Sequence, residues 1–226
     1  LSSSNGPAAQ ALKAAGIPLP RLPESLVVHR TKDALILCGG DSRGLMYAAL
    51  EVARTYPDVR AVAESPYIAE RGVSMYTMHR PTFENRLYDP HYWERYFDLL
   101  ARSRINSFVV IFGYENGGFL APVYPYFFDT DGFPEVHFTS LSAEGQRKNT
   151  AAFKTMIRLA HERGIDVTVG IWDHIYRGGV QGGGIEGADA TVGKALPWLV
   201  TGVTEQNLVP YTKAALAKFI ATFPEI

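Results

Sequence analysis

The spacing of hydrophobic residues changes near residue 66 and divides the chain into two parts. Residues 1–66 carry short apolar runs and short helical segments between turns, which is typical of a small α+β domain. Residues 67–226 repeat a longer order of apolar run, polar segment and helix, which is typical of successive βα units. We therefore predict an α/β fold with two domains, over 1–66 and 67–226.

The first part predicts a hairpin flanked by helices. Residues 25–30 and 34–38 are β-prone and are separated by a three-residue turn. Apolar residues at helical spacing over 8–15 predict a helix that ends at a glycine. A second helix is predicted after Asp41, which acts as its N-cap. The predicted buried face of this second helix consists of Leu45, Met46, Ala49, Leu50 and Ala53.

The second part predicts three β-strands, over residues 71–78, 106–113 and 166–172. The middle run is almost entirely apolar, as in a strand of a parallel sheet covered by helices. Helices with one apolar face are predicted from Pro90, over 150–163 and over 204–221. Long segments follow the strands and short turns precede them, which favours the first units of a TIM (β/α)8 barrel over an open doubly wound sheet. Because a closed barrel needs ~250 residues, we expect the chain to be truncated.

Charge and composition narrow the choice of partners. The chain has 22 Lys and Arg against 23 Asp and Glu, so it presents no basic field for nucleic acid or an anionic membrane. It has neither an apolar run of ~20 residues nor the pattern of a signal peptide at its start. The single cysteine, Cys38, excludes an intrachain disulfide framework and is expected to be buried. No glycine-rich nucleotide-binding sequence follows a predicted strand, so no cofactor is predicted.

Polar and aromatic side chains are concentrated in the long segments after the strands, at 78–89, 113–149 and 173–203. In a barrel these segments meet at the carboxyl ends of the strands. Acids and amides that bind hydroxyls, together with aromatic rings that cover the apolar face of a sugar, are typical of a carbohydrate site. Glycoside hydrolysis needs two carboxyl groups, or one carboxyl group and a substrate acetamido group. Glu115 and Asp173 are the predicted catalytic acids, and the substrate-binding residues predicted there are Tyr114, Asn116, Trp172, His174 and Tyr176. Arg71, at the start of the first strand, is a further predicted sugar contact.

Several of these candidates also have a structural interpretation. Arg71 at the start of a strand would pair with a carboxylate near the domain junction. Glu115 would be a solvated residue beside an Asn-Gly turn. Asp173 and His174 would order the loop after their strand without touching a ligand. The glycine-rich run at 178–184 lacks the Lys-Ser or Lys-Thr of a phosphate-binding loop and is expected to be a mobile loop.

A metal site would draw on His79, Glu115, Asp173 and His174. Zinc sites in hydrolases usually show tight spacings such as His-x-His, and none is present. We therefore predict no metal. The other histidines are expected at the surface or in packing roles, at positions His29, His91, His137 and His161.

The run Gly40-Asp41-Ser42-Arg43-Gly44-Leu45 resembles the turn between strand and helix in the small domain that precedes the barrel of β-hexosaminidases and α-glucuronidases. Arg71-Gly72-Val73-Ser74-Met75 looks like the start of the first barrel strand in the same enzymes. The resemblance implies that Arg71 binds hydroxyls of the non-reducing-end sugar. It also implies that Glu115 or Asn116 ends the second strand as a sugar-binding group, and that His174 ends the third.

The chain departs from hexosaminidases at the first strand, which reads Ser-Met-Tyr-Thr-Met-His-Arg in place of Leu-Asp-x-Ser/Ala-Arg-His. The adjacent Asp-Glu that ends the fourth strand would lie beyond residue 226, so the fragment alone is expected to be inactive. The implied function is a glycoside hydrolase that acts on an oligo- or polysaccharide, compatible with a periplasmic or secreted location. The alternatives are a non-catalytic carbohydrate-binding protein on a degenerate barrel and a metal-dependent barrel hydrolase.

Overall fold

The computed structural model describes residues 6–77, 80–112, 123–138, 141–171 and 200–226. It confirms the predicted α/β class, because an antiparallel three-stranded sheet is followed by parallel strands that alternate with helices. The chain forms two compact units, which we describe separately. Unit 1 comprises Leu1–Arg71 and Leu99–Ile105, and unit 2 comprises Gly72–Asp98 and Asn106–Ile226.

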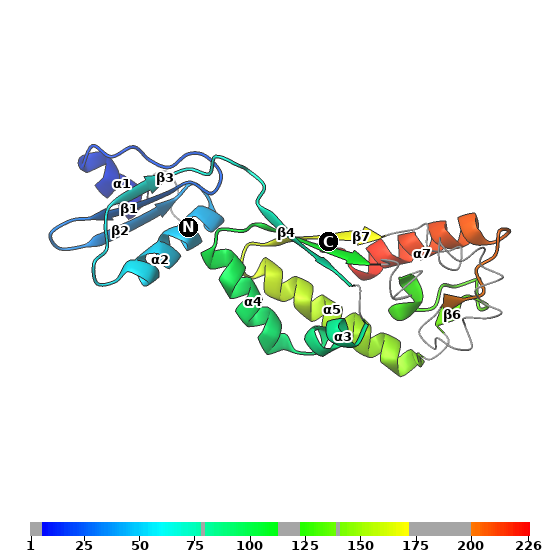
Figure 1. Cartoon of the computed structure of the whole chain (residues 1–226). Coiled ribbons are helices and arrows are strands. Elements are labelled where there is room, and N and C mark those ends of the chain that lie inside the picture. Colours follow the sequence, from blue (N-terminus) through cyan, green and yellow to red (C-terminus); the bar gives the residue numbers. More distant parts are fainter. Residues whose placement is uncertain (1–5, 78–79, 113–122, 139–140, 172–199) are drawn as a thin grey trace. The chain divides into compact units, whose positions relative to one another are not determined.

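Unit 1 is an antiparallel sheet with a helix on each face (Figure 1). Successive residues of its central strand point to opposite faces. Val27 packs beside Cys38 against the first helix, and Leu26 and Val28 pack against the second. The hairpin and the burial of Cys38 are as predicted, whereas the third strand is not anticipated by the sequence. The elements are α1 (Pro7–Ala14), β1 (Leu26–Arg30), β2 (Leu35–Gly39), α2 (Ser42–Thr55) and β3 (Val62–Glu64).

The predicted buried face of α2 is wrong in part. Gly44 and Tyr47 are buried, whereas Ala49 and Ala53 are exposed. The reason is a backbone contact, since a Cβ at Gly44 would lie 2.2 Å from the carbonyl oxygen of Ser25. This close approach turns the helix so that the residues three and four positions after Gly44 face the sheet. The other predicted residues are half-buried, at positions Leu45, Met46 and Leu50.

Unit 2 contains a parallel sheet in the order β4-β5-β7, which confirms the three predicted strands. On one face of the central strand, Phe108, Val110 and Phe112 are fully buried. On its other face, Val109 and Ile111 are only partly buried within the described part of the chain. The strands are β4 (Gly72–Tyr76), β5 (Ser107–Phe112) and β7 (Asp166–Ile171).

Aromatic rings hold α4 (Pro90–Arg102) and α5 (Ala143–His161) on the same face of this sheet (Figure 1). Phe97 of α4 meets Phe108 with ring centroids 5.3 Å apart, and Phe153 of α5 meets Phe112 at 5.5 Å. The predicted N-cap of α4 is present, because the backbone N–H of its third residue donates to Asp89 Oδ1 at 3.1 Å.

Two helices of unit 2 differ from the prediction. Residues 78–89 are predicted as a loop but contain α3 (Arg80–Leu87). Phe83 and Leu87, which stand one turn apart on this helix, are both buried. The helix predicted from residue 150 begins seven residues earlier. Its true start is set by the Ser142 hydroxyl, which accepts a hydrogen bond from Gly145 N at 3.2 Å.

The remaining elements of unit 2 are short, apart from the last helix. The predicted final helix is α7 (Leu208–Thr222), with Tyr211, Ala215 and Phe219 buried. The sequence does not predict the 3-10 helix η2 (Tyr124–Tyr126), nor the antiparallel pair formed by β6 (His137–Phe138) and β8 (Val200–Thr201).

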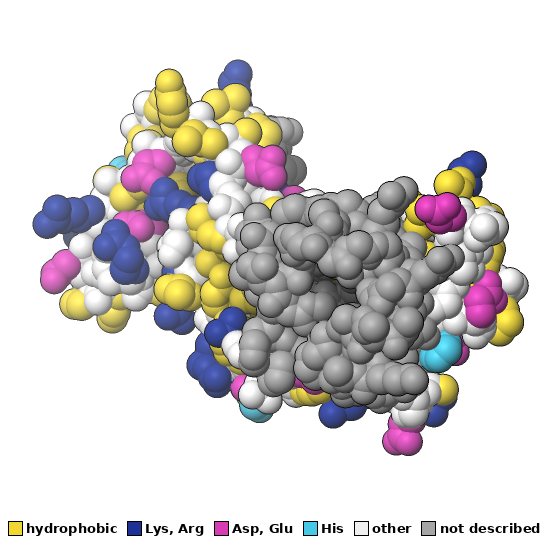
Figure 2. Space-filling view, turned by 45° about the vertical axis from the view of Figure 1, so that its right-hand side comes forward, with side chains coloured by type: hydrophobic (Ala, Val, Ile, Leu, Met, Phe, Trp, Pro, Cys, Tyr) yellow, Lys and Arg dark blue, Asp and Glu magenta, His cyan; other side chains and the backbone are white. Residues whose placement is uncertain are grey.

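The described surface carries charges of both signs. On the face drawn in Figure 2, acidic and basic side chains both occur among hydrophobic ones, consistent with the balanced composition. Within the described ranges, no helix combines the length and the apolar character needed to cross a membrane. The four histidines expected at the surface or in packing roles are partly or fully exposed, at positions His29, His91, His137 and His161.

Candidate functional site

The carboxyl ends of the three parallel strands lie side by side. Tyr76 of β4 pairs with Ile111 of β5, and Phe112 of β5 pairs with Ile171 of β7. The segments that leave these strands therefore start from one edge of the sheet. This is the edge where the sequence predicts a carbohydrate site.

Most of the predicted site residues follow this edge closely in the sequence. Glu115 comes three positions after the end of β5, and Asp173 comes two positions after the end of β7. Both predicted acids lie outside the described residues, so their roles stay predictions. The same holds for Tyr114, Asn116, Trp172, His174 and Tyr176.

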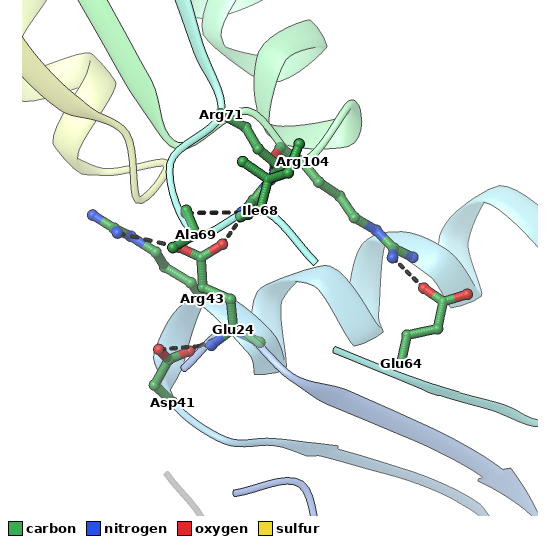
Figure 3. Close-up of polar contacts among 9 residues, drawn as sticks. Glu24, Asp41, Arg43, Glu64, Ile68, Ala69, Arg71 and Arg104 are labelled. Atoms are coloured by element: carbon green, nitrogen blue, oxygen red, sulfur yellow. Dashed lines mark hydrogen bonds and ion pairs between the residues drawn. The ribbon is translucent and has the colours of Figure 1, made fainter. Parts of the chain in front are cut away.

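Arg71 precedes β4, so it lies at the amino end of that strand. Five residues at ~3.3 Å each separate it from the carboxyl end by about 17 Å. Its Nε donates to the carbonyl oxygen of Arg104 at 2.7 Å, and its Nη1 donates to those of Ile68 and Ala69 at 2.7 and 3.0 Å (Figure 3). Its Nη2 forms an ion pair with Glu24. These contacts correspond to the structural interpretation of Arg71.

The motif that carries the family resemblance is built around the same carboxylate. Asp41 Oδ1 accepts a hydrogen bond from Gly44 N at 2.8 Å and caps α2, while its Oδ2 accepts one from Glu24 N at 3.0 Å (Figure 3). Arg43 Nη1 lies 3.3 Å from Glu24 Oε1. Glu24 is 7% exposed and bonds both guanidinium groups. We call Glu24, Asp41, Arg43 and Arg71 the Glu24 cluster.

Two residues around Arg71 have a left-handed backbone, Glu24 with φ 59° and Arg104 with φ 58°. This conformation is uncommon outside glycine and costs on the order of 1 kcal/mol. The carboxylate of Glu24 forms an ion pair with Arg71, and the carbonyl oxygen of Arg104 accepts a hydrogen bond from Arg71. Arg104 also pairs through its own guanidinium with Glu64, and with Glu51 at 3.5 Å. The hydrogen bonds and ion pairs of Arg71 therefore hold two strained positions in place.

A second polar cluster lies in unit 2, in the segments that follow the first two parallel strands. Tyr126 Oη donates to Glu84 Oε1 at 2.9 Å, and Asn149 Nδ2 donates to the carbonyl oxygen of Tyr126 at 2.9 Å. The Tyr88 hydroxyl donates to Asn149 Oδ1. Tyr126 and Asn149 are fully buried. We call Glu84, Tyr88, Tyr126 and Asn149 the tyrosine cluster.

The sequence does contain a signal for part of this cluster. Asn149 stands four positions before Phe153 and seven before Met156, which are both buried on α5. A helix begun at Ser142 would have placed Asn149 on the same face. The prediction missed it because the apolar spacing becomes clear only after residue 150.

Burial changes the acidity of tyrosines in both units. Burial raises the pKa of Tyr126 far above its ordinary value, and the negative charge of Glu84 adds to the rise. Tyr126 therefore stays neutral and keeps the proton that it donates to Glu84. Burial also raises the pKa of Tyr47 in unit 1, with a further contribution from the charge of Glu24.

The metal alternative is not tested by the described residues. Over these ranges, no three side chains among His, Cys, Asp and Glu are grouped so as to hold a metal ion. The residues proposed for such a site lie outside the described ranges, at His79, Glu115, Asp173 and His174.

No protein-family model and no curated protein matches this sequence. Solved structures do match its fold. A GH138 enzyme targeting pectin rhamnogalacturonan II aligns with 96% of the chain at TM-score 0.63 and 17% identity. A β-N-acetylhexosaminidase from Bacteroides fragilis aligns with 91% at TM-score 0.56 and 16% identity. A GH20 exo-β-N-acetylglucosaminidase from Vibrio harveyi aligns with 89% at TM-score 0.52 and 13% identity.

The chain spans 27%, 41% and 34% of the lengths of these three structures. At such identities the likeness shows the fold alone. An antiparallel sheet followed by parallel βα units, as in part of the GH20 structures, is the architecture that the resemblance implied.

Proposed function

We propose that the chain is part of a glycoside hydrolase and binds an oligo- or polysaccharide at the carboxyl edge of its parallel sheet. The observation that carries the proposal is the common register of β4, β5 and β7, in a fold shared with parts of glycoside hydrolases. In this proposal residues 67–226 begin a (β/α)8 barrel, and residues 1–66 form the domain that precedes it. Catalysis in barrels takes place at the carboxyl ends of the strands.

The proposed roles follow from the chemistry of each side chain. Glu115 and Asp173 are the carboxyl groups that this part of the barrel contributes beside the bound sugar, as members of the acid set that glycoside hydrolysis requires. Asn116 and His174 bind hydroxyl groups. The aromatic faces cover the apolar side of the sugar rings, at Tyr114, Trp172 and Tyr176. The balanced charge supports a ligand without high charge.

Arg71 takes a different role in this proposal. Its guanidinium is bonded to Glu24 and to backbone carbonyl groups of unit 1. We therefore assign it to the folding of unit 1 and base the glycan site on the other seven residues.

Calorimetric titration of the 226-residue chain with a panel of oligosaccharides tests the proposal. Glu115→Gln and Asp173→Asn each remove a charge that accepts hydrogen bonds from sugar hydroxyls, so each should weaken binding about tenfold. Glu144→Gln is the matched control, because Glu144 is exposed in the first turn of α5. Failure of the wild-type chain to bind any glycan would overturn the function. Equal binding by both acid variants and the wild type would overturn the assignment of the acids.

A further inference from the structure

Residues 123–138, which we call the bridging segment, connect the segments that follow all three parallel strands. The bridging segment itself comes after β5. It contacts α3, which follows β4, through the hydrogen bond between Tyr126 and Glu84. It pairs with β8, which follows β7, through Phe138 and Val200.

Helix α5 holds the bridging segment by its backbone. Three consecutive carbonyl groups, those of residues 125 to 127, each accept a hydrogen bond from a side chain of α5. The donors are Gln146 Nε2 at 3.0 Å, Asn149 Nδ2 at 2.9 Å and Thr150 Oγ1 at 2.9 Å. These donors stand at helical spacing, on one face of α5. The bridging segment is thus fixed to a helix that packs on the sheet.

The bridging segment also packs closely against the residue that follows β8. A Cβ at Gly202 would lie 1.8 Å from the carbonyl oxygen of Glu135, so only glycine fits there, and its φ is +84°. Asn207 Nδ2 donates to Glu135 Oε1 at 3.0 Å, and Lys218 Nζ of α7 donates to the carbonyl oxygen of Asp129 at 2.8 Å. These bonds fix the end of the connection that begins at β7.

The contact to α3 includes a side-chain hydrogen bond donated by one buried hydroxyl. Tyr126 is fully buried and neutral, and its Oη donates to a carboxylate on α3. Hydrogen bonds to a charged acceptor are about twice as strong as neutral ones. Tyr88, directly after α3, adds its hydrogen bond to Asn149, and Lys148 Nζ lies 3.8 Å from the centre of its ring.

We propose that Tyr126 is a positioning residue for the glycan site. Its hydroxyl acts through Glu84 to hold α3 against the bridging segment, and so keeps the connections that leave β4 and β5 in one arrangement. This inference rests on the proposed function. A small displacement of the groups that bind a ligand removes much of their contribution to affinity. A binding site therefore depends on neighbouring residues that hold those groups in place.

Tyr126→Phe tests the inference, because it removes the hydroxyl and keeps the packing of the ring. Amide hydrogen exchange of residues 80–88 should become about fivefold faster, and glycan affinity should fall about fivefold. Tyr211→Phe is the matched control. It removes a buried hydroxyl from α7 and leaves the bond to Glu84 intact, so it should change neither quantity.

Substitutions at Glu84 separate positioning from general stability. Glu84→Gln keeps an oxygen that accepts the Tyr126 proton and should retain most of the glycan affinity, whereas Glu84→Leu should lose it as Tyr126→Phe does. The double variant Tyr126→Phe/Glu84→Leu should bind glycan no more weakly than the single variant with the lower affinity, since the two substitutions remove the same contact.

Two outcomes would overturn the inference in a chain that binds glycan. One is unchanged exchange of residues 80–88 in Tyr126→Phe, and the other is faster exchange with unchanged affinity. Absence of glycan binding by the wild-type chain would instead overturn the proposed function, and the exchange of residues 80–88 would then decide whether Tyr126 fixes α3.

Discussion

The Glu24 cluster and the tyrosine cluster both bury polar groups, but they differ in charge and in place. The Glu24 cluster is ionic, is built from a recognisable sequence motif, and includes the residue before the first parallel strand. The tyrosine cluster is mostly neutral, has no sequence motif, and joins segments that follow the strands. The motif that carries the family resemblance is thus stabilised by ion pairs, whereas the segments that follow the strands are joined mainly by neutral hydrogen bonds.

The largest effect is expected from Gly44→Ala. The new methyl group would meet the backbone at Ser25 at 2.2 Å, where no side chain can move aside. Overpacking of this kind costs about 3 kcal/mol. Urea unfolding should show that loss of stability if the motif is a folding element.

Gly145→Ala is the matched control for this substitution. Its methyl group would meet Leu141 Cδ1 at 2.6 Å, which is the end of a flexible side chain. Because alanine favours helix by roughly 1 kcal/mol, this variant should be neutral or more stable. Equal losses in the two variants would show that the contact at Ser25 has no special weight.

Glu24→Gln should have the next largest effect. It leaves the guanidinium groups of Arg43 and Arg71 without their shared carboxylate, at a position that is 7% exposed. We expect a loss of about 2 kcal/mol, less than for a fully buried pair because both arginines reach solvent. Glu162→Gln, which breaks an exposed pair with Arg158, should cost under about 0.5 kcal/mol. Similar losses of stability for the two variants in urea unfolding would show that the ion pairs of Glu24 contribute no more than an exposed pair.

For the tyrosine cluster we expect a smaller effect on the free energy of unfolding, which appears only at high pH. The pKa of Tyr126 is raised in the folded state, so above about pH 10 the unfolded chain releases this proton and the folded chain does not. Stability should therefore fall as pH rises, by up to ~1.4 kcal/mol per pH unit for this residue.

Tyr126→Phe should reduce that slope by the same amount. Urea unfolding of both proteins between pH 7 and 11 measures it, and the slopes should agree below pH 9, where the tyrosine is neutral in both states. Identical slopes above pH 10 would show that the hydroxyl is not held in its neutral form.

Local signals allowed much of the fold to be predicted. The hairpin, the central strand and the Asp41 cap each depend on residues close together in sequence. Helix α3 was missed because its burial depends on a distant contact, between Phe83 and Phe112 with ring centroids 5.9 Å apart. Its own sequence offers few apolar positions.

The candidate site was predictable only as a location. Apolar runs identify the strands, and the strand ends identify the edge of the sheet. The partner of Arg71 was not predictable, because Glu24 stands 47 residues before it and sequence spacing does not say which carboxylate it meets. Tyr126 was not predictable either, since its partners belong to two different helices.

The pairing of β6 with β8 has a consequence for engineering by loop exchange. Residues 172–199 run between β7 and β8, and both of these strands are hydrogen-bonded to neighbours. When both ends of a connection are held, doubling its length costs only about 0.6 kcal/mol in chain entropy. The fold should therefore accept grafted connections of quite different length between Ile171 and Val200, which makes this position suitable for testing how connection length affects stability.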